Sequence, residues 1–215
     1  MSSAEFYDNF INYQVKSGIN DRIYGLYKRL CRYGLDTNTN ILEIGCGIGT
    51  LTYLLLSKVK SGSIEAVDIS PKSIEFATRN LKASNLLLTT ADILQFEPKK
   101  KAFERILLFD VLEHIPIEQH TQIFLRITTW MNDESLLLIN IPNPAAILHE
   151  QKNDPSGLQE TDQPVYLAPL SAALASASLD IFSAETYSIW IQDEYQFLVV
   201  KKRKEFEKKV LSRER

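Results

Sequence analysis

The chain has 215 residues, of which 45% are hydrophobic and 24% are charged, as is ordinary for one globular domain with a sizeable core. Its formal net charge of -3 provides no basic field, which counts against a DNA partner. The longest apolar runs, such as residues 136–139, are too short to cross a bilayer, so we expect no membrane span. The polar N-terminus has no signal-peptide pattern, and the two cysteines form no metal-ligand or disulfide pattern. A cytoplasmic protein is the simplest expectation.

Residues 3–33 read as one amphipathic helical stretch, in which Tyr24, Tyr27 and Leu30 share a face. Gly34 then fits a helix C-cap. The stretch is therefore predicted to pack on the rest of the domain as a helical cap.

Residues 41–59 hold the most informative motif. An apolar run carrying one carboxylate, Glu43, enters a loop with glycine at positions 45, 47 and 49, and a stretch that reads as a helix follows. Glycine permits positive φ and close approach of a ligand, and the free N–H groups at a helix start lie beside that ligand. The pattern predicts a loop that binds a nucleoside cofactor.

The spacing distinguishes this loop from two other nucleotide-binding loops. A dinucleotide fingerprint would need a third glycine where the chain has Thr50, and no Gly-Lys-Ser/Thr of a P-loop follows. Glu43, two residues before the first glycine, suits a cationic ligand without phosphates. The stretch resembles the first motif, E-x-G-x-G-x-G, of the class I S-adenosylmethionine-dependent methyltransferases. This resemblance implies S-adenosylmethionine as the cofactor, bound by Glu43, Gly45, Cys46, Gly47 and Gly49.

A short strand is predicted at residues 64–69, and Asp68 lies near its end. This acid follows the glycine loop by about twenty residues, the distance at which nucleotide-binding βαβ units hold the ribose hydroxyls. A carboxylate can accept two hydrogen bonds from a vicinal diol, although Asp68 could instead be a turn residue at a strand end. The resemblance also places the neighbouring Ile69 at the cofactor.

Two further strand ends carry candidate cofactor contacts. In the resembled family, an acid after the next strand (residues 86–90) binds the adenine amino group and the following apolar residue packs on the ring, which implies these roles for Asp92 and Ile93. The fourth strand (residues 106–109) leads into Asp110. Because this strand should lie beside the first, its carboxyl end borders the ligand crevice, and Asp110 should meet the methionine end of the cofactor.

Residues 112–116, Leu-Glu-His-Ile-Pro, resemble the motif that follows this strand in the same family. His114 is the candidate general base, because a neutral imidazole can take a proton near neutral pH. It could instead anchor the turn or pack against the cofactor. His149 is a second candidate base, whereas His120 falls off the apolar stripe of a helix predicted at residues 118–131 and is expected at the surface.

Residues 142–164 follow a strand predicted at residues 135–141, and they read as a substrate loop or lid. Pro142 and Pro144 are expected to keep the start of this loop out of a helix. The acids near His149 match no magnesium-ligand pattern, so no metal is expected. Candidate substrate contacts are Tyr7, Tyr13, Arg22, Asn140 and Asn143. The alternative for the N-terminal aromatic residues is simple packing on the sheet.

The C-terminal part reads as a helix over residues 165–178 and two alternating strands over residues 179–190 and 195–201. Together the elements predict an α/β three-layer sandwich on a mostly parallel seven-stranded sheet with a C-terminal antiparallel strand pair. We expect one methyltransferase domain over residues 1–215. Its parts are a helical cap (1–36), a cofactor-binding core (37–141), the substrate loop (142–164), and a closing helix, strand pair and tail (165–215).

The resemblance implies methyl transfer to a small molecule or a carrier-bound biosynthetic intermediate. Such transfer depends mainly on alignment and desolvation, and a hydroxyl nucleophile also benefits from a base. The motif of enzymes that methylate the amines of bases or of glutamine is absent after the fourth strand, which, with the negative net charge, counts against DNA and protein-glutamine substrates. For a small-molecule substrate, transfer to oxygen is favoured over transfer to nitrogen. Other open readings are an RNA methyltransferase with a partner chain, a non-catalytic binding protein of the same fold, a nicotinamide-dependent oxidoreductase, and a homodimer.

Overall fold

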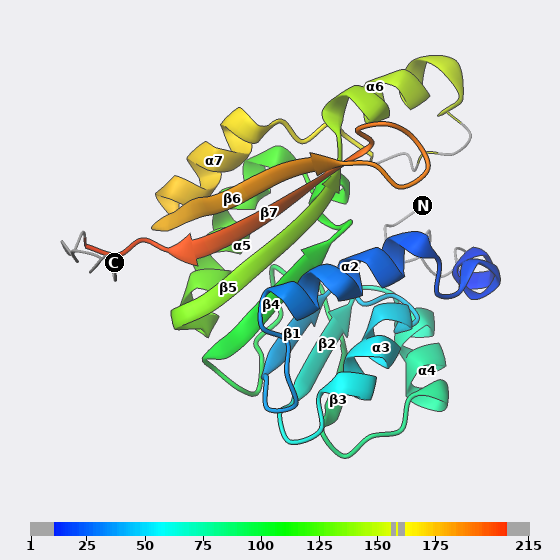
Figure 1. The fold of residues 1–215 in the computed structure, drawn as a ribbon, viewed down its shortest axis with the longest axis vertical. Helices are drawn as coiled ribbons and strands as arrows, with labels where there is room; N and C mark the ends of the chain where they lie inside the picture. The colour runs from blue at the N-terminus through cyan, green and yellow to red at the C-terminus, as the bar shows by residue number, and fades with distance from the viewer. Residues whose placement is uncertain (1–10, 156–157, 159–161, 206–215) are drawn as a thin grey trace, which may run out of the picture.

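The computed structural model describes residues 11–155, 158 and 162–205. Its centre is a seven-stranded sheet of order β3-β2-β1-β4-β5-β7-β6 (Figure 1). The strands are β1 (Ile41–Ile44), β2 (Ile64–Asp68), β3 (Leu86–Thr90), β4 (Phe103–Phe109), β5 (Met131–Pro142), β6 (Leu179–Tyr187) and β7 (Tyr195–Lys202). The helices are α2 (Asp21–Arg32), α3 (Thr50–Lys58), α4 (Pro71–Asn80), α5 (Ile117–Trp130), α6 (Pro144–Asn153) and α7 (Leu167–Ser176), with a 3-10 turn η1 (Leu112–His114).

The strand pairing confirms the predicted sheet. β1 pairs in parallel with both β2 and β4, β2 pairs in parallel with β3, and β4 pairs in parallel with β5. β7 is antiparallel to both of its neighbours, β5 and β6. The first and fourth strands are therefore adjacent, and the crevice between their carboxyl ends is the place where doubly wound sheets bind ligands.

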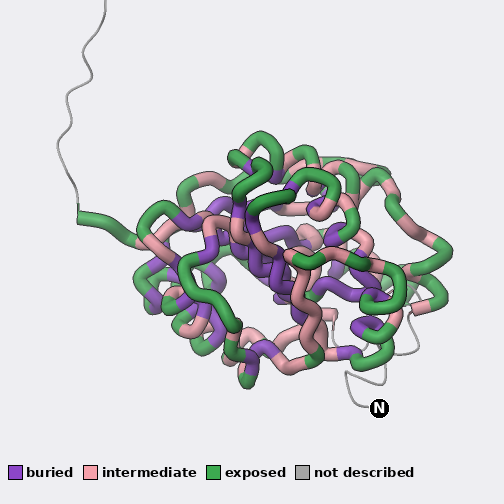
Figure 2. The backbone as a smooth tube through the Cα atoms, turned by 90° about the horizontal axis from the view of Figure 1, so that it is seen from below, coloured by how far each residue is buried: buried purple, intermediate pink, exposed green. Residues whose placement is uncertain are grey.

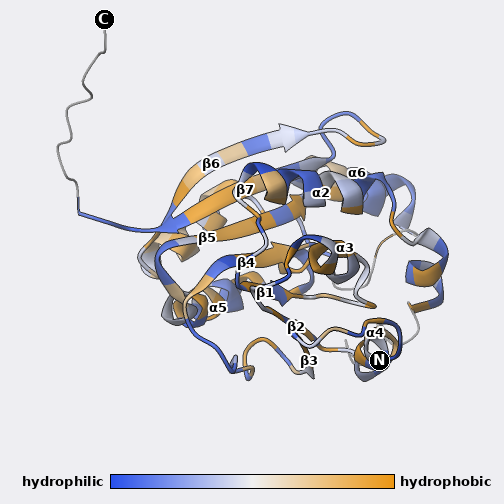
Figure 3. Cartoon of the chain, turned by 60° about the horizontal axis from the view of Figure 1, so that its bottom comes forward, coloured by the Kyte–Doolittle hydropathy of each residue, from blue (hydrophilic) through white to orange (hydrophobic). Residues whose placement is uncertain are grey.

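Two apolar layers hold the helices on the sheet. Side chains of α5 and α7 pack on one face, and side chains of α2, α3 and α4 pack on the other. Because both faces are covered, the central strands are nearly continuous apolar runs, as Figure 3 shows, and Figure 2 shows the buried backbone gathered in the middle. Among the described residues, no helix is long and apolar enough to cross a membrane.

The helical stretch predicted over residues 3–33 is interrupted near residue 18. A helix over residues 11–17 ends before Gly18, whose φ of +52° lies in the left-handed region. The side chain of Asn20 then accepts a hydrogen bond from the N–H of Ile23 at 3.0 Å and caps the start of α2. The chain therefore turns between two short helices, which places the first of them over the carboxyl edge of the sheet.

The prediction that the prolines keep the chain out of a helix after β5 is wrong. Pro144 occupies the first position of α6, where a missing N–H costs nothing because that N–H has no partner within the helix. The side chain of Asn143 accepts a hydrogen bond from the N–H of Ala145 at 3.0 Å and caps this helix. The first half of the expected loop is thus α6.

The prediction that His120 lies at the surface is also wrong, since its side chain is only 1% exposed. Its Nε2 lies 3.1 Å from the carbonyl oxygen of Leu112 and 3.0 Å from that of Ile115, so this nitrogen must carry the proton. Burial lowers the pKa of His120. The buried face of α5 is wider than its apolar stripe, because this helix also supports the η1 turn.

Candidate functional site

A cavity of about 580 Å³ lies at the carboxyl ends of β1, β2 and β4. Most of the residues predicted from the sequence line it. These are Tyr13, Arg22, Glu43, Gly45, Cys46, Gly47, Asp68, Ile69, Asp92, Ile93, Asp110 and His114. The fold therefore gathers side chains from four strand ends and from the N-terminal cap around one space.

Among the described residues, the four other predicted residues do not line this cavity. Gly49 has a φ of +83° and starts α3, where a Cβ would lie 2.5 Å from Cδ1 of Leu81, so its role is in packing. Asn140 is fully buried and Asn143 caps α6. His149 is exposed on α6, where its Nδ1 lies 3.1 Å from Nδ2 of Asn153. Tyr7 lies outside the described residues.

The glycine loop is a tight cradle between β1 and α3. Gly45 and Gly47 have φ values of +78° and +53°, which other residues rarely adopt. A Cβ on Gly45 would collide with the side chain of Val111, and one on Gly47 would lie 2.7 Å from Nε2 of Gln14. The loop therefore needs glycine both for its backbone conformation and for the space above it.

Asp68 ties this loop to the end of β2. Its Oδ2 accepts a hydrogen bond from the N–H of Gly47 at 2.7 Å, and its Oδ1 accepts one from the N–H of Ser70 at 2.9 Å. A carboxylate oxygen can accept more than one hydrogen bond, so Asp68 can hold the loop and still meet a ligand hydroxyl in the cavity.

Glu43 is a buried carboxyl group at the floor of the cavity, with 4% of its surface exposed. Burial raises its pKa to about 8, the charge of Asp68 adds to this, and the hydrogen bond donated by Thr52 to Oε2 at 2.6 Å opposes it. A cationic ligand nearby would favour the ionised form of Glu43. The same burial raises the pKa of the Cys46 thiol, so this cysteine is a packing residue and not a thiolate.

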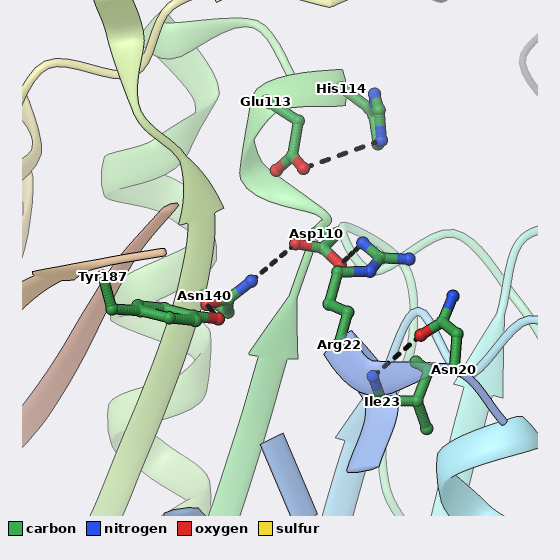
Figure 4. A network of polar contacts seen from close by, with 8 residues as sticks. All are labelled: Asn20, Arg22, Ile23, Asp110, Glu113, His114, Asn140 and Tyr187. Carbon is green, nitrogen blue, oxygen red and sulfur yellow. Dashed lines mark hydrogen bonds and ion pairs between the residues drawn. The ribbon is translucent and has the colours of Figure 1, made fainter. Parts of the chain in front are cut away.

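A polar network joins the N-terminal helix to the sheet above the cavity (Figure 4). Arg22 of α2 forms an ion pair with Oδ2 of Asp110, and this charge raises the pKa of Arg22. Oδ1 of Asp110 accepts a hydrogen bond from Nδ2 of Asn140 at 2.7 Å, and the hydroxyl of Tyr187 donates to Oδ1 of Asn140 at 2.8 Å. Asn140 therefore orients Asp110 from behind and does not reach the cavity.

The η1 turn after β4 presents Glu113 and His114 to the cavity. Glu113 is 2% exposed, and burial raises its pKa to about 8. Nε2 of His114 lies 3.9 Å from Oε1 of Glu113, and its Nδ1 lies 2.7 Å from Oδ1 of Asp162. Neither acid was predicted as a site residue, although Glu113 lies within the Leu-Glu-His-Ile-Pro string.

The turn between β6 and β7 forms another part of the cavity wall, which sequence reasoning also missed. Oε1 of the buried Glu194 accepts hydrogen bonds from the N–H groups of residues 189–191 at 2.7, 2.6 and 3.2 Å. This carboxylate fixes a turn that brings Trp190 and Ile191 to the cavity beside Ile147 of α6. An apolar wall of this kind suits the non-reacting part of a substrate. Among the described residues, no group of three or more His, Cys, Asp or Glu side chains could hold a metal ion.

Comparison with known proteins bears on this cavity. The family model described as a methyltransferase domain matches residues 41–134, which include the glycine loop, Asp68, Asp92 and the η1 turn. Residues 41–134 carry a methyltransferase domain of the class I S-adenosylmethionine-dependent type. The cofactor of this class of domain is S-adenosylmethionine.

Two curated relatives are methyltransferases with different acceptor atoms. The chain is 30% identical over 113 residues to the probable (S)-tetrahydroprotoberberine N-methyltransferase 2 of Papaver bracteatum, covering 51% of this chain and 30% of that protein. It is 32% identical over 99 residues to the malonyl-(acyl-carrier protein) O-methyltransferase 1 of Ilyobacter polytropus, covering 46% of this chain and 34% of that protein. The chain thus spans about a third of the length of these relatives.

The methyltransferase fold extends over nearly the whole chain. The magnesium protoporphyrin IX methyltransferase of Synechocystis, solved with bound S-adenosylhomocysteine, superposes with a TM-score of 0.72 at 15% identity, covering 93% of this chain and 97% of that one. At this identity the likeness supports the fold alone. It includes the strand pair β6 and β7, which the matched family segment does not reach.

The residues around the cavity fit S-adenosylmethionine. Gly45 and Gly47 give the loop the positive φ values of its tight turn at the cavity, and Asp68 lies beside them as an acceptor for hydroxyl groups. Asp92 lines the cavity with one carboxylate oxygen bound to the N–H of Leu94 at 2.8 Å, and the apolar Ile93 follows it. Acidic and apolar side chains, with little phosphate-binding character, suit a sulfonium nucleoside better than a pyrophosphate.

Proposed function

We propose that the chain is a methyltransferase that transfers the methyl group of S-adenosylmethionine to an oxygen atom of a small molecule or a carrier-bound biosynthetic intermediate. The observation that carries this proposal is that the glycine loop and Asp68 share one cavity with His114. A cofactor on the loop would therefore have a titratable base and an apolar wall within the same cavity. The proposed site residues are those that line the cavity, with His114 as the base.

When bound, S-adenosylmethionine supplies an electrophilic methyl group, and its sulfur takes the electron pair as the carbon–sulfur bond breaks. Asp68 and the glycine loop hold the nucleoside, and Asp92 with Ile93 contacts its adenine ring. Nε2 of His114 takes the proton of the substrate hydroxyl while the new oxygen–carbon bond forms, and water later removes that proton. The buried part of the cavity, around Glu43 and Glu113, keeps water away from the bound groups.

The presence of a base in the cavity bears on which atom accepts the methyl group. A hydroxyl group is a weak nucleophile until it loses its proton, whereas an amine needs only to be uncharged, so a histidine in the cavity favours oxygen. Transfer to nitrogen is the second candidate. Glu113 and Glu150 line the same cavity, and acidic groups attract a cationic amine.

The test is a methyl-transfer assay with isotopically labelled S-adenosylmethionine and a panel of hydroxylated compounds, carboxylated acyl thioesters and amines. We expect labelled O-methyl product, with kcat lower by roughly 10²-fold or more in His114→Gln. His149→Gln is the matched control, since His149 is exposed and outside the cavity, and it should retain full turnover. Product methylated only on nitrogen, or unchanged turnover in His114→Gln, would refute transfer to oxygen by this base.

A further inference from the structure

Asp162 lies against the imidazole of His114, although 48 positions separate them in the sequence. Oδ1 of Asp162 is 2.7 Å from Nδ1 of His114, and the two side chains are 9% and 15% exposed. Ordinary surface ion pairs are far more exposed than this, and their geometry is correspondingly loose. The contact is enclosed, and its two atoms lie at the distance of an ion pair.

The backbone around Asp162 is held on two sides. Nε2 of Gln151, on α6, donates a hydrogen bond to the carbonyl oxygen of Asp162 at 3.0 Å. On the other side, the N–H of Gln163 donates to the carbonyl oxygen of Glu113 at 3.1 Å. The side-chain Nε2 of Gln163 donates to the carbonyl oxygen of Ile115. These bonds fix residues 162–163 on the η1 turn, so the carboxylate of Asp162 is placed relative to the ring and not merely near it.

We propose that Asp162 is a positioning residue that fixes the orientation and the tautomer of His114. An ionised carboxylate is only an acceptor, so the neutral imidazole beside it must carry its proton on Nδ1. Nε2 then becomes the nitrogen that can take a proton from a substrate, with Nδ1–H held by Asp162. This inference rests on the proposed function only for the identity of the proton donor, because the pairing itself is a property of the chain.

The charged groups around His114 set the expected pH dependence. Glu113 shares its turn, Asp110 ends the neighbouring strand and pairs with Arg22, and Asp162 faces it from the other side. Burial lowers the pKa of His114, but the hydrogen bond to Asp162 and the charges of the three acids outweigh burial, so the net pKa is raised above its ordinary value. Activity that needs neutral imidazole should therefore appear only as the pH rises above that ordinary value.

The experiment follows the histidine side chains by NMR during a pH titration of the apo protein. The chain has three histidines, and the signal that His114→Gln removes is that of His114. In Asp162→Asn we expect the pKa of His114 to fall by about one pH unit and the Nδ1–H tautomer to lose its dominance. Asp162→Glu keeps the carboxylate, so it should restore much of the pKa of His114 and of the population of its Nδ1–H tautomer. Asp154→Asn, an exposed acid nearby in the sequence, is the matched control and should change neither.

The same variants are then assayed for methyl transfer. Asp162→Asn should shift the rising limb of the pH–kcat profile to lower pH and lower its plateau by about tenfold or more, with KM little changed. An unchanged His114 titration in Asp162→Asn, in protein that melts like the wild type, overturns the inference whatever the activity. Full turnover in His114→Gln overturns the proposed base instead and leaves the pairing in place, so the two failures are distinguishable.

Discussion

Arg22 of α2 forms an ion pair with Asp110, the residue that follows β4, and so connects the N-terminal cap to the carboxyl edge of the sheet (Figure 4). Asp110 has a φ of +55°, and its N–H donates to the carbonyl oxygen of Asn140 at 2.9 Å. Its backbone and its carboxylate are thus both fixed by β5, while Arg22 approaches from the other side. The cap over the cavity is held at this point by charge as well as by apolar packing.

Arg22→Met should lower the free energy of unfolding by about 1–3 kcal/mol, because it leaves the largely buried carboxylate of Asp110 without its cation. The measurement is urea denaturation at neutral pH. Arg79→Met is the matched control, since the ion pair of Arg79 with Glu75 is exposed on α4 and should contribute at most about 0.5 kcal/mol. Equal losses in the two variants would argue against a structural role for the Arg22 pair.

Gly45→Ala should destabilise the protein by about 1–3 kcal/mol and weaken cofactor binding, because the new Cβ meets Val111 and the φ of +78° is strained for alanine. Gly25→Ala is the opposite control. Gly25 lies within α2 with no atom within 4 Å of its would-be Cβ, so alanine should stabilise by about 0.5–1 kcal/mol. Thermal melting of both variants checks the pair, and a neutral Gly45→Ala would contradict the loop geometry.

The glycine loop and the strand order were predictable because their signals are local. Glu43 and the alternating glycines specify a loop conformation within a few residues, and short apolar runs such as residues 41–44 indicate buried parallel strands. The helix α6 was missed because Pro144 can either break a helix or begin one, and only its neighbours in space decide which. The same holds for His120, whose burial depends on the η1 turn packed against α5.

The pairing of Asp162 with His114 had no signal in the sequence. The segment that carries Asp162 has no periodicity, and its position is set by hydrogen bonds to the backbone of Glu113 and Ile115. The turn that presents Trp190 was missed for a similar reason, since one buried carboxylate, that of Glu194, organises it. Contacts between distant segments complete the site, and residue patterns do not encode them.

Asp68→Ala should weaken S-adenosylhomocysteine binding by about 1–3 kcal/mol, or roughly tenfold to a hundredfold, because it removes a charged acceptor from the cavity and frees the N–H of Gly47. The measurement is calorimetric titration. Asp180→Ala serves as the control, since Asp180, which lies on β6, forms an exposed ion pair with Arg203. Unchanged affinity in Asp68→Ala would remove the assignment of the ribose hydroxyls to this residue.

Glu43→Gln should flatten the dependence of stability on pH. The pKa of Glu43 is raised to about 8 in the folded state, so between its ordinary value and pH 8 the folded protein holds a proton that the unfolded chain has released. Stability therefore falls as the pH rises through this window, by at most about 1.4 kcal/mol per pH unit from this group. Denaturation at pH 5, 6.5 and 8 should show a smaller loss in Glu43→Gln than in the wild type. The exposed Glu134→Gln should retain the wild-type slope.

The central claim is that the cavity between β1 and β4 binds a sulfonium nucleoside, and calorimetric titration of the unmodified protein tests it most directly. S-adenosylmethionine, S-adenosylhomocysteine and NADH are titrated in parallel. We predict micromolar binding of the two sulfur nucleosides and no binding of NADH. The acids Glu43 and Asp68 border the loop, and Thr50 occupies the position where a dinucleotide site would have its third glycine. Binding of NADH alone, or of none of the three, would contradict the account.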